Sequence, residues 1–181
     1  MSRILIPCPG CGTLFPPYDG PTHRYIGASA ACWALFTSFT CGSPDADLLA
    51  HSRPPQITTK SPTDTGALGA VLGDAYGVQH HGEDSPQAIQ SVALHLLSLH
   101  GAIAHRADGL WVKERALRKH GVFHKLSPPT LGFALTIRHL FPSEGLDRVV
   151  TRSEYAQSVY DAWVALHRTT VESWYRSYVA A

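Results

Sequence analysis

Apolar residues recur at intervals of three and four residues along much of this chain, the spacing that places them on one face of a helix. The clearest such pattern follows Ser85, which suits the cap position of a helix, and Pro86, which suits its first turn. This helix is apolar around so much of its circumference that we expect it to lie at the centre of the fold. The same spacing predicts further helices over 29–39, 65–80, 110–119, 131–140 and 152–178, with one short helical turn over 45–51.

Glycine and proline mark the boundaries between these segments. Residues 1–22 are rich in both and predict a loop, and Gly121 is expected at the C′ position of the helix over 110–119. No segment shows the alternation that predicts a strand. The sequence therefore predicts an all-α fold, a bundle of about five to six helices in a single domain over 1–181. Within that domain, 1–28 is expected to be a knuckle and loop segment, and 29–181 the helical bundle.

The composition limits the classes of partner. The chain has 181 residues, of which 44% are hydrophobic, so one domain with a substantial core is expected. The formal charge is +1, which gives no general attraction for nucleic acid or for an anionic membrane, and neither is expected as a partner. Charged residues make up only 16% of the chain, and this low share favours a surface covered by a second copy, a homo-oligomer.

No targeting or membrane-spanning segment is expected. The apolar run Ile4-Leu5-Ile6 is too short for the core of a signal peptide, and no run reaches the roughly 18 apolar residues of a spanning helix. A cytoplasmic location is therefore predicted. Thiols stay reduced there, so paired cysteines indicate a metal site or a redox pair more often than a structural disulfide.

The segment Cys8-Pro9-Gly10-Cys11 is the strongest chemical signal in the chain. Two thiols two residues apart, on a turn made by proline and glycine, point to one soft cation, and Zn²⁺ is the metal expected. Cys32 is the best candidate for a third ligand, because a thiolate in the first turn of a helix is stabilised by unpaired N–H groups. Cys32 as a small buried residue is the alternative. Cys41 is a weaker candidate for a metal ligand.

Histidines are the expected source of the remaining ligand. His80 ends one predicted helix near Asp74, and His95 lies midway along the apolar helix, where a polar ring must be ligated or hydrogen-bonded. A satisfied core histidine is the alternative for either one. The candidate metal ligands are thus Cys8, Cys11, Cys32, His80 and His95. We also expect Asp74, His80, Gln90, His95 and His167 to meet in one polar cluster, and surface or helix-end positions for His81, His100, His105, His120, His124 and His139.

Three longer motifs identify relatives: Cys8-Pro9-Gly10-Cys11-Gly12, Asp74-Ala75-Tyr76-Gly77-Val78-Gln79-His80 and Gln90-Ser91-Val92-Ala93-Leu94-His95-Leu96. Together they resemble a bacterial family of small proteins classed only as a domain of unknown function. The resemblance covers nearly the whole chain and implies no activity. This chain departs from it at His81, where relatives have proline, and at Ala30-Ala31, where Ser-Pro is usual. Because His81 follows His80, the sequence leaves open which of these two imidazoles is the ligand.

Three functions follow from these residues. The first is a zinc-binding helical protein whose metal is structural. The second is a metalloenzyme with an open metal or polar site between helices, using Asp74, His80 and His95. The third is a thiol-redox protein using Cys8 and Cys11, and the lack of a thioredoxin-like pattern counts against it. The sequence does not indicate which small molecule, if any, the protein binds.

Overall fold

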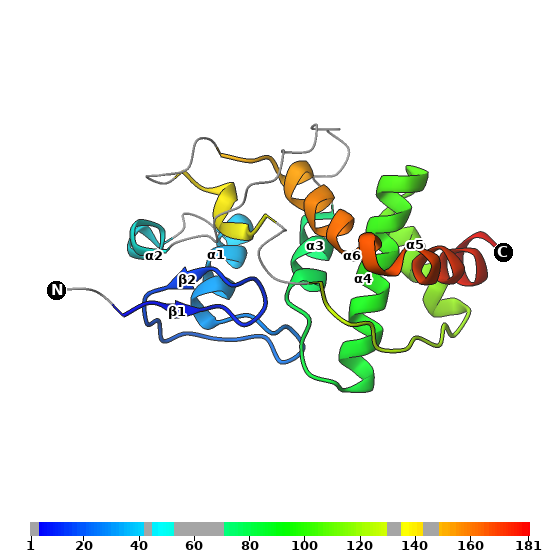
Figure 1. Ribbon diagram of the computed structural model, residues 1–181, viewed down its shortest axis with the longest axis horizontal. Coiled ribbons are helices and arrows are strands. Elements are labelled where there is room, and N and C mark those ends of the chain that lie inside the picture. Colours follow the sequence, from blue (N-terminus) through cyan, green and yellow to red (C-terminus); the bar gives the residue numbers. More distant parts are fainter. Residues whose placement is uncertain (1–3, 42–44, 53–70, 130–134, 143–148) are drawn as a thin grey trace.

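The computed structural model describes residues 4–41, 45–52, 71–129, 135–142 and 149–181. The chain is mostly helical, which confirms the predicted all-α class (Figure 1). The described elements are β1 (Ile6–Pro7), β2 (Leu14–Phe15), α1 (Ala30–Cys41), α2 (Ala46–His51), α3 (Leu72–Gln79), α4 (Pro86–His105), α5 (Gly109–Arg118), the 3₁₀ helix η2 (Ile137–Leu140), α6 (Arg152–Tyr175) and the π-helical turn η3 (Arg176–Ala180).

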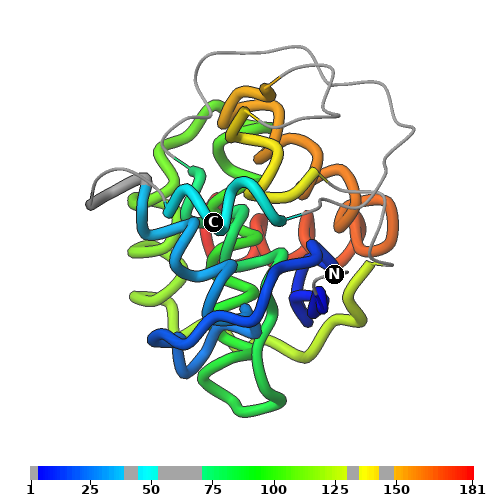
Figure 2. The backbone as a smooth tube through the Cα atoms, turned by 90° about the vertical axis from the view of Figure 1, so that its left-hand side faces the viewer, coloured from blue at the N-terminus to red at the C-terminus, as the bar shows by residue number. Residues whose placement is uncertain are grey.

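Helices α3, α5 and α6 pack around α4, whose apolar pattern predicts such a central position. Helix α4 contacts α3, α5 and α6, and its residues Leu96, Leu97 and Leu99 are fully buried. The β1–β2 hairpin, α1 and α2 lie at one end of the molecule, α5 and the end of α6 at the other, and α3 between them (Figure 1). Figure 2 views the molecule from the hairpin end, with the hairpin and α1 nearest the viewer. The hairpin lies against α1, near the end of α3 (Figures 1 and 2).

Local sequence signals set several helix boundaries. Ser85 caps α4 by accepting a hydrogen bond from the Ala88 N–H at 3.2 Å, with proline in the first turn. Thr151 and Glu154 form a reciprocal capping box at the start of α6, with distances of 3.1 and 2.8 Å. The predicted helix over 65–80 is present as α3, and its residues 65–70 lie outside the described part of the chain. For the predicted helix over 131–140, the described portion is the short η2 turn.

The end of α5 differs from the prediction by one residue. His120, not Gly121, occupies the C′ position, with a left-handed φ of 51°. The His120 N–H bonds to the Leu117 carbonyl at 3.0 Å, and the Gly121 N–H bonds to the Ala116 carbonyl at 3.2 Å, the pair of bonds of a Schellman motif. Glycine at 121 serves packing instead, because a Cβ there would lie 2.7 Å from the Phe123 ring.

The N-terminal segment contains a hairpin that the sequence pattern did not predict. β1 and β2 pair antiparallel, with Ile6 opposite Phe15 and Pro7 opposite Leu14. Strands of two residues are too short to show alternation, so no periodicity could identify them. Phe15 is 1% exposed and anchors the hairpin in the core.

Two histidines expected at the surface or at a helix end are buried. His100 is 4% exposed, and its Nδ1 lies 2.9 Å from the Tyr160 hydroxyl on α6. His139 is 6% exposed and accepts a hydrogen bond from the Thr136 N–H at 2.9 Å. Helix packing supplies Tyr160 from a distant sequence position, whereas Thr136 is a local partner in the capping box of η2. Burial lowers the pKa of both imidazoles, for His100 to about 4.

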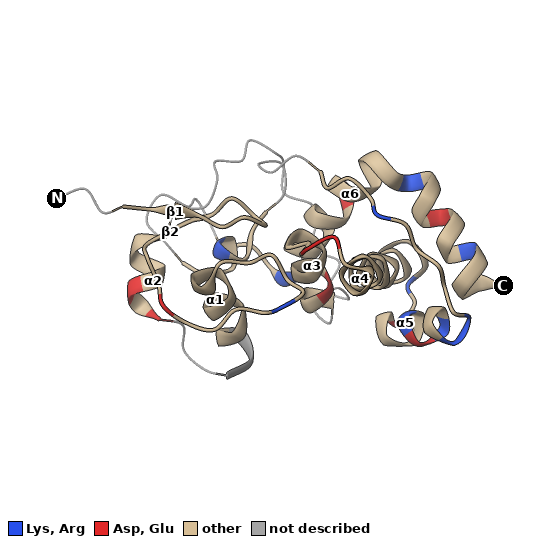
Figure 3. Cartoon of the chain, turned by 90° about the horizontal axis from the view of Figure 1, so that it is seen from below, with Lys and Arg blue, Asp and Glu red and all other residues tan. Residues whose placement is uncertain are grey.

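Charged residues are sparse along the described chain (Figure 3). Basic residues gather at the end of α5, where Arg115 donates hydrogen bonds to the carbonyls of Val179 and Ala181 at 2.6 and 2.9 Å. This basic face therefore ties the end of the described chain to α5. Within the described ranges, no helix combines the length and the apolar character that crossing a bilayer requires.

Candidate metal centre

The β1–β2 hairpin presents two thiols on the inner side of its turn. The Cys8 N–H bonds to the Thr13 carbonyl at 2.8 Å, and the Gly12 N–H bonds back to the Cys8 carbonyl at 2.9 Å. Gly12 has φ 73°, a conformation that glycine adopts without strain. This closed turn holds Cys8 and Cys11 in the interior, where they are 1% and 2% exposed.

Helix α1 supplies a third thiol. The Ser29 hydroxyl accepts a hydrogen bond from the Cys32 N–H at 3.3 Å, so Cys32 lies in the capped first turn of α1. Its side chain is fully buried. The sequence-based placement of Cys32 beside the knuckle therefore agrees with the structure, in which the sulfurs of Cys11 and Cys32 lie 3.9 Å apart.

His80 reaches the thiols from the end of α3. Its carbonyl accepts a hydrogen bond from the Gly27 N–H at 2.8 Å, and His81 forms an isolated bridge with Ile26, so the main chain fastens this corner to the knuckle segment. The His80 Nε2 lies 3.3 Å from the Cys32 sulfur. Glycine at position 10 makes the approach feasible, because a Cβ there would lie 2.5 Å from the imidazole Cδ2.

The four donor atoms form a group of the size of a tetrahedral zinc site. The ligand atoms of Cys8, Cys11, Cys32 and His80 all lie within 4.8 Å of one another, and all four side chains are buried. Zinc bonds of about 2.3 Å to sulfur and 2.0 Å to nitrogen imply edges of roughly 3.8 Å between sulfurs and 3.5 Å between sulfur and nitrogen. The observed edges of 3.9 and 3.3 Å fit these values, whereas a disulfide would need about 2 Å. These donors therefore fit a metal ion, and they fit zinc in kind and in spacing.

Each donor also has a partner outside the group. The Ser29 N–H donates to the Cys8 sulfur at 3.4 Å, and the Tyr76 hydroxyl donates to the Cys32 sulfur at 3.5 Å. The Thr13 hydroxyl lies 3.3 Å from the Cys11 sulfur. Three thiolates and one Zn²⁺ carry a net charge of −1, and the Ser29 N–H and the Tyr76 O–H can stabilise that charge in a buried site.

The imidazole of His80 is oriented for coordination. Its Nδ1 lies 2.9 Å from the Tyr76 carbonyl, one helical turn earlier, and its ring stacks on the Tyr76 ring with centroids 3.9 Å apart. A proton on Nδ1 donated to this carbonyl leaves the Nε2 lone pair directed toward the sulfurs. Orientation of this kind is typical of histidines that bind metal.

The electrostatics of the group favour a bound cation. Hydrogen bonds from Cys11 and Cys32 hold the pKa of Cys8 far below its usual range, whereas burial raises the pKa of Cys32. Burial alone would lower the pKa of His80, but its contacts with Cys11 and Cys8 raise it to about 9. Negative charge on sulfur thus attracts positive charge into the centre of the group, the role that a metal ion fills once the thiols are deprotonated.

His95 lies outside this group and forms a second polar cluster. Its Nδ1 is 2.6 Å from the Asp74 carboxylate on α3, the Ser98 hydroxyl donates to the other carboxylate oxygen at 2.5 Å, and Lys113 on α5 pairs with the same carboxylate. Although burial opposes the charge of Asp74, these partners outweigh it and lower the pKa of the carboxyl. The carboxylate therefore ties three helices together.

The structure does not bring the five residues of the expected polar cluster together. Of the five candidate ligands, four converge in the thiol group, while His95 pairs with Asp74. Gln90 is exposed, and His167 contacts the Ser127 carbonyl at 2.7 Å. The side chain of Cys41 lies outside the described residues.

Sequence reasoning missed the residues that support the sulfurs. Thr13, Ser29 and Tyr76 act through hydrogen bonds rather than as donors to the ion. A signal existed for Tyr76, because it precedes His80 by four residues and therefore lies on the same face of the helix. Thr13 could have been suspected from its place two residues after Cys11.

The family model of a family of unknown function, DUF5946, matches residues 6–164. The chain belongs to this family. The matched range includes all four donors of the thiol group, so the DUF5946 region contains the whole candidate centre. No curated protein and no solved structure gives a significant match.

We expect Gly10→Ala to disturb this centre and Gly73→Ala to leave it intact. The new Cβ at position 10 would press on the His80 ring and on the Gly27 carbonyl, 2.9 Å away, so a loss of about 2 kcal/mol in unfolding free energy and weaker metal binding should follow. Gly73 is exposed on α3, and the nearest atom to a Cβ there would lie 4.0 Å away. Alanine at this position should raise the unfolding free energy by at most about 1 kcal/mol. Denaturant unfolding and metal titration of both variants would test this, and equal behaviour would contradict it.

Proposed function

We propose that this protein binds one Zn²⁺ ion through Cys8, Cys11, Cys32 and His80, and that the ion is structural. The observation that carries the proposal is the convergence of three thiols and one correctly oriented imidazole in a fully buried space. Structural zinc sites have four protein ligands, whereas catalytic sites have three and keep a position for water or substrate. A complete and buried donor set supports the structural role.

The ion would connect three parts of the chain that are distant in sequence. Cys11 and Cys32 are 21 residues apart, and Cys32 and His80 are 48 residues apart. The hairpin has strands of only two residues each and could not be stable alone. Zinc would therefore hold the hairpin, the first turn of α1 and the end of α3 in one arrangement, and folding of this end would depend on the metal.

The two alternatives have less support. A metalloenzyme using Asp74, His80 and His95 would need these side chains in one site, and His80 lies with the thiols while the other two pair elsewhere. A thiol-redox protein would need Cys8 or Cys11 open to attack, and both are almost fully buried. Three free thiols in the described interior favour a reducing compartment, so we retain the cytoplasm as the proposed location.

Removal of the metal distinguishes a structural from a catalytic ion. Chelation of purified protein under mild denaturation should release zinc together with the loss of near-ultraviolet circular dichroism, because the metal end unfolds when the ion leaves. Restoring one equivalent of Zn²⁺ should restore the signal. Zinc that can be removed with no change in dichroism or melting temperature would contradict the structural role.

A further inference from the structure

Two imidazoles near the C-terminal end of α4 form a contact that the thiol group does not explain. The Nε2 atoms of His100 and His105 lie 3.2 Å apart. Tyr175 of α6 packs against both rings: it stacks on His105, with centroids 4.2 Å apart, and meets His100 edge-on at 5.1 Å. The Tyr160 hydroxyl lies 2.9 Å from the His100 Nδ1. Both imidazoles are therefore held in place by side chains of α6.

A hydrogen bond between two neutral imidazoles is the simplest interpretation of this contact. In a straight N–H···N bond of this length, the centroids of the two rings would lie roughly 5.5 Å apart. The centroids of His100 and His105 are only 5.0 Å apart. At least one ring is therefore turned by about 40° or more from the line that joins the nitrogens, so the hydrogen bond is poorly aligned.

The same distances fit two ligands of one metal ion. Imidazoles turned equally and to the same side would direct both Nε2 lone pairs at one point about 2.1 Å from each nitrogen, the length of a zinc–imidazole bond. The angle between the two bonds at that point would be about 100°, between the octahedral and tetrahedral values. An ion there would use both lone pairs, whereas a bent hydrogen bond uses one of them poorly.

The surroundings suit a cation. Burial and the neighbouring His105 lower the pKa of His100 to about 4, so this imidazole is neutral at pH 7 and able to bind a metal. His105 is the last residue of α4, where the carbonyl end of the helix dipole attracts positive charge. The charge of Glu172 on α6 also acts on His100 in favour of a cation and opposes that of Arg168.

We propose that His100 and His105 bind one divalent transition-metal ion through their Nε2 atoms, with water in its remaining positions. Imidazole pairs suit Ni²⁺, Cu²⁺ and Zn²⁺. His105 is exposed, so the ion would exchange with solvent. Two neutral ligands hold an ion less tightly than three thiolates and an imidazole, so dialysis would remove this ion and leave zinc in the thiol group. The two sites share no residue, and this one does not depend on the role of the first.

Titration with Ni²⁺ of dialysed protein that already holds one equivalent of Zn²⁺ tests this proposal. Zinc is measured before the titration, so a failure of the thiol centre is recorded separately. Calorimetry should show one Ni²⁺ bound per chain, without the absorption bands of sulfur-to-nickel charge transfer. In NMR, the paramagnetic ion should broaden the ring signals of Tyr160 and Tyr175 first, since their rings contact the two imidazoles. No bound Ni²⁺, or Ni²⁺ that shows those bands, would overturn the proposal.

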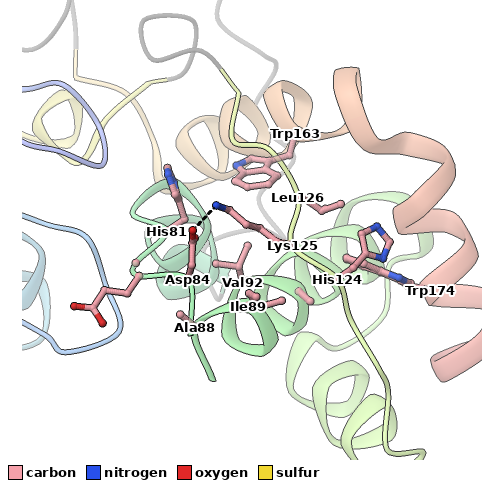
Figure 4. Close-up of a pocket in the computed structure, with 13 residues that line it drawn as sticks. His81, Asp84, Ala88, Ile89, Val92, His124, Lys125, Leu126, Trp163 and Trp174 are labelled. Carbon is pink, nitrogen blue, oxygen red and sulfur yellow. Dashed lines mark hydrogen bonds and ion pairs between the residues drawn. The ribbon is translucent and has the colours of Figure 1, made fainter. Parts of the chain in front are cut away.

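One exposed substitution and its matched control assign the ligands. His105→Gln should weaken Ni²⁺ binding at least ten-fold, because it removes one of the two protein ligands. His124→Gln is the control: His124 is also exposed, but its ring packs edge-on against the indole of Trp174, with centroids 5.2 Å apart, rather than against an imidazole (Figure 4). This variant should bind Ni²⁺ with unchanged affinity. Unchanged binding in His105→Gln, or equal weakening in both variants, would overturn the proposal.

Discussion

Replacing Cys32 with serine should abolish zinc binding and lower the unfolding free energy by at least about 3 kcal/mol, which for a chain of this size is roughly 10 °C in melting temperature. The substitution removes the sulfur that lies 3.9 Å from Cys11 and 3.3 Å from the His80 Nε2. It also leaves the Tyr76 hydroxyl without its sulfur partner in a fully buried position. Elemental analysis of the purified variant and thermal unfolding would measure both effects.

Metal content is the decisive readout, because any change at a buried cysteine can cost stability. Val78→Ala provides the first control: Val78 is fully buried in the same core, so the variant should lose stability while keeping its zinc. His95→Gln provides the second, since His95 lies outside the thiol group and its loss should leave zinc content unchanged. A Cys32→Ser variant that retains a full equivalent of zinc would refute the assignment of this ligand.

Replacing Asp74 with alanine should lower the unfolding free energy by about 3 kcal/mol without loss of zinc. The carboxylate is 8% exposed and holds His95, Ser98 and Lys113, so its removal leaves an ammonium only 24% exposed with no counter-charge. The contacts between α3, α4 and α5 would weaken together. Chemical denaturation at neutral pH, with zinc measured in parallel, would test this expectation.

The matched control is Asp84→Ala, which also removes one carboxylate from a lysine pair. Asp84 is 69% exposed, so water replaces it readily and the loss should stay below about 1 kcal/mol. If Asp74→Ala and Asp84→Ala lose similar amounts of unfolding free energy, burial does not strengthen the Asp74 ion pair. The interpretation that this carboxylate holds three helices together is then wrong. Loss of zinc from Asp74→Ala alone would instead indicate coupling between the two clusters.

Much of the helical architecture could be predicted because its signals are local. Ser85 and Pro86 define the start of α4 within two residues, and the apolar pattern that follows identifies the helix at the centre. The hairpin could not be predicted, because its pairs Ile6–Phe15 and Pro7–Leu14 are too few to produce a pattern. His120 in the left-handed position was missed for another reason, since glycine next to it is the more usual occupant.

The candidate ligands could be named from the sequence, but their grouping could not. His80 and His95 are equivalent in chemistry, and the choice between them is made by the Gly27–His80 hydrogen bond and the Ile26–His81 bridge, which join segments far apart. Helix geometry did contain a warning about Asp74 and His80. Six residues along a helix correspond to about 600° of rotation, so the two side chains leave α3 in different directions.

Zinc-edge X-ray absorption on untreated, reduced protein tests the central claim most directly. The arrangement of Cys8, Cys11, Cys32 and His80 predicts one zinc per chain, with three sulfur neighbours at about 2.3 Å and one nitrogen at about 2.0 Å. Folded protein that contains no zinc, or a metal surrounded mainly by oxygen, would contradict it.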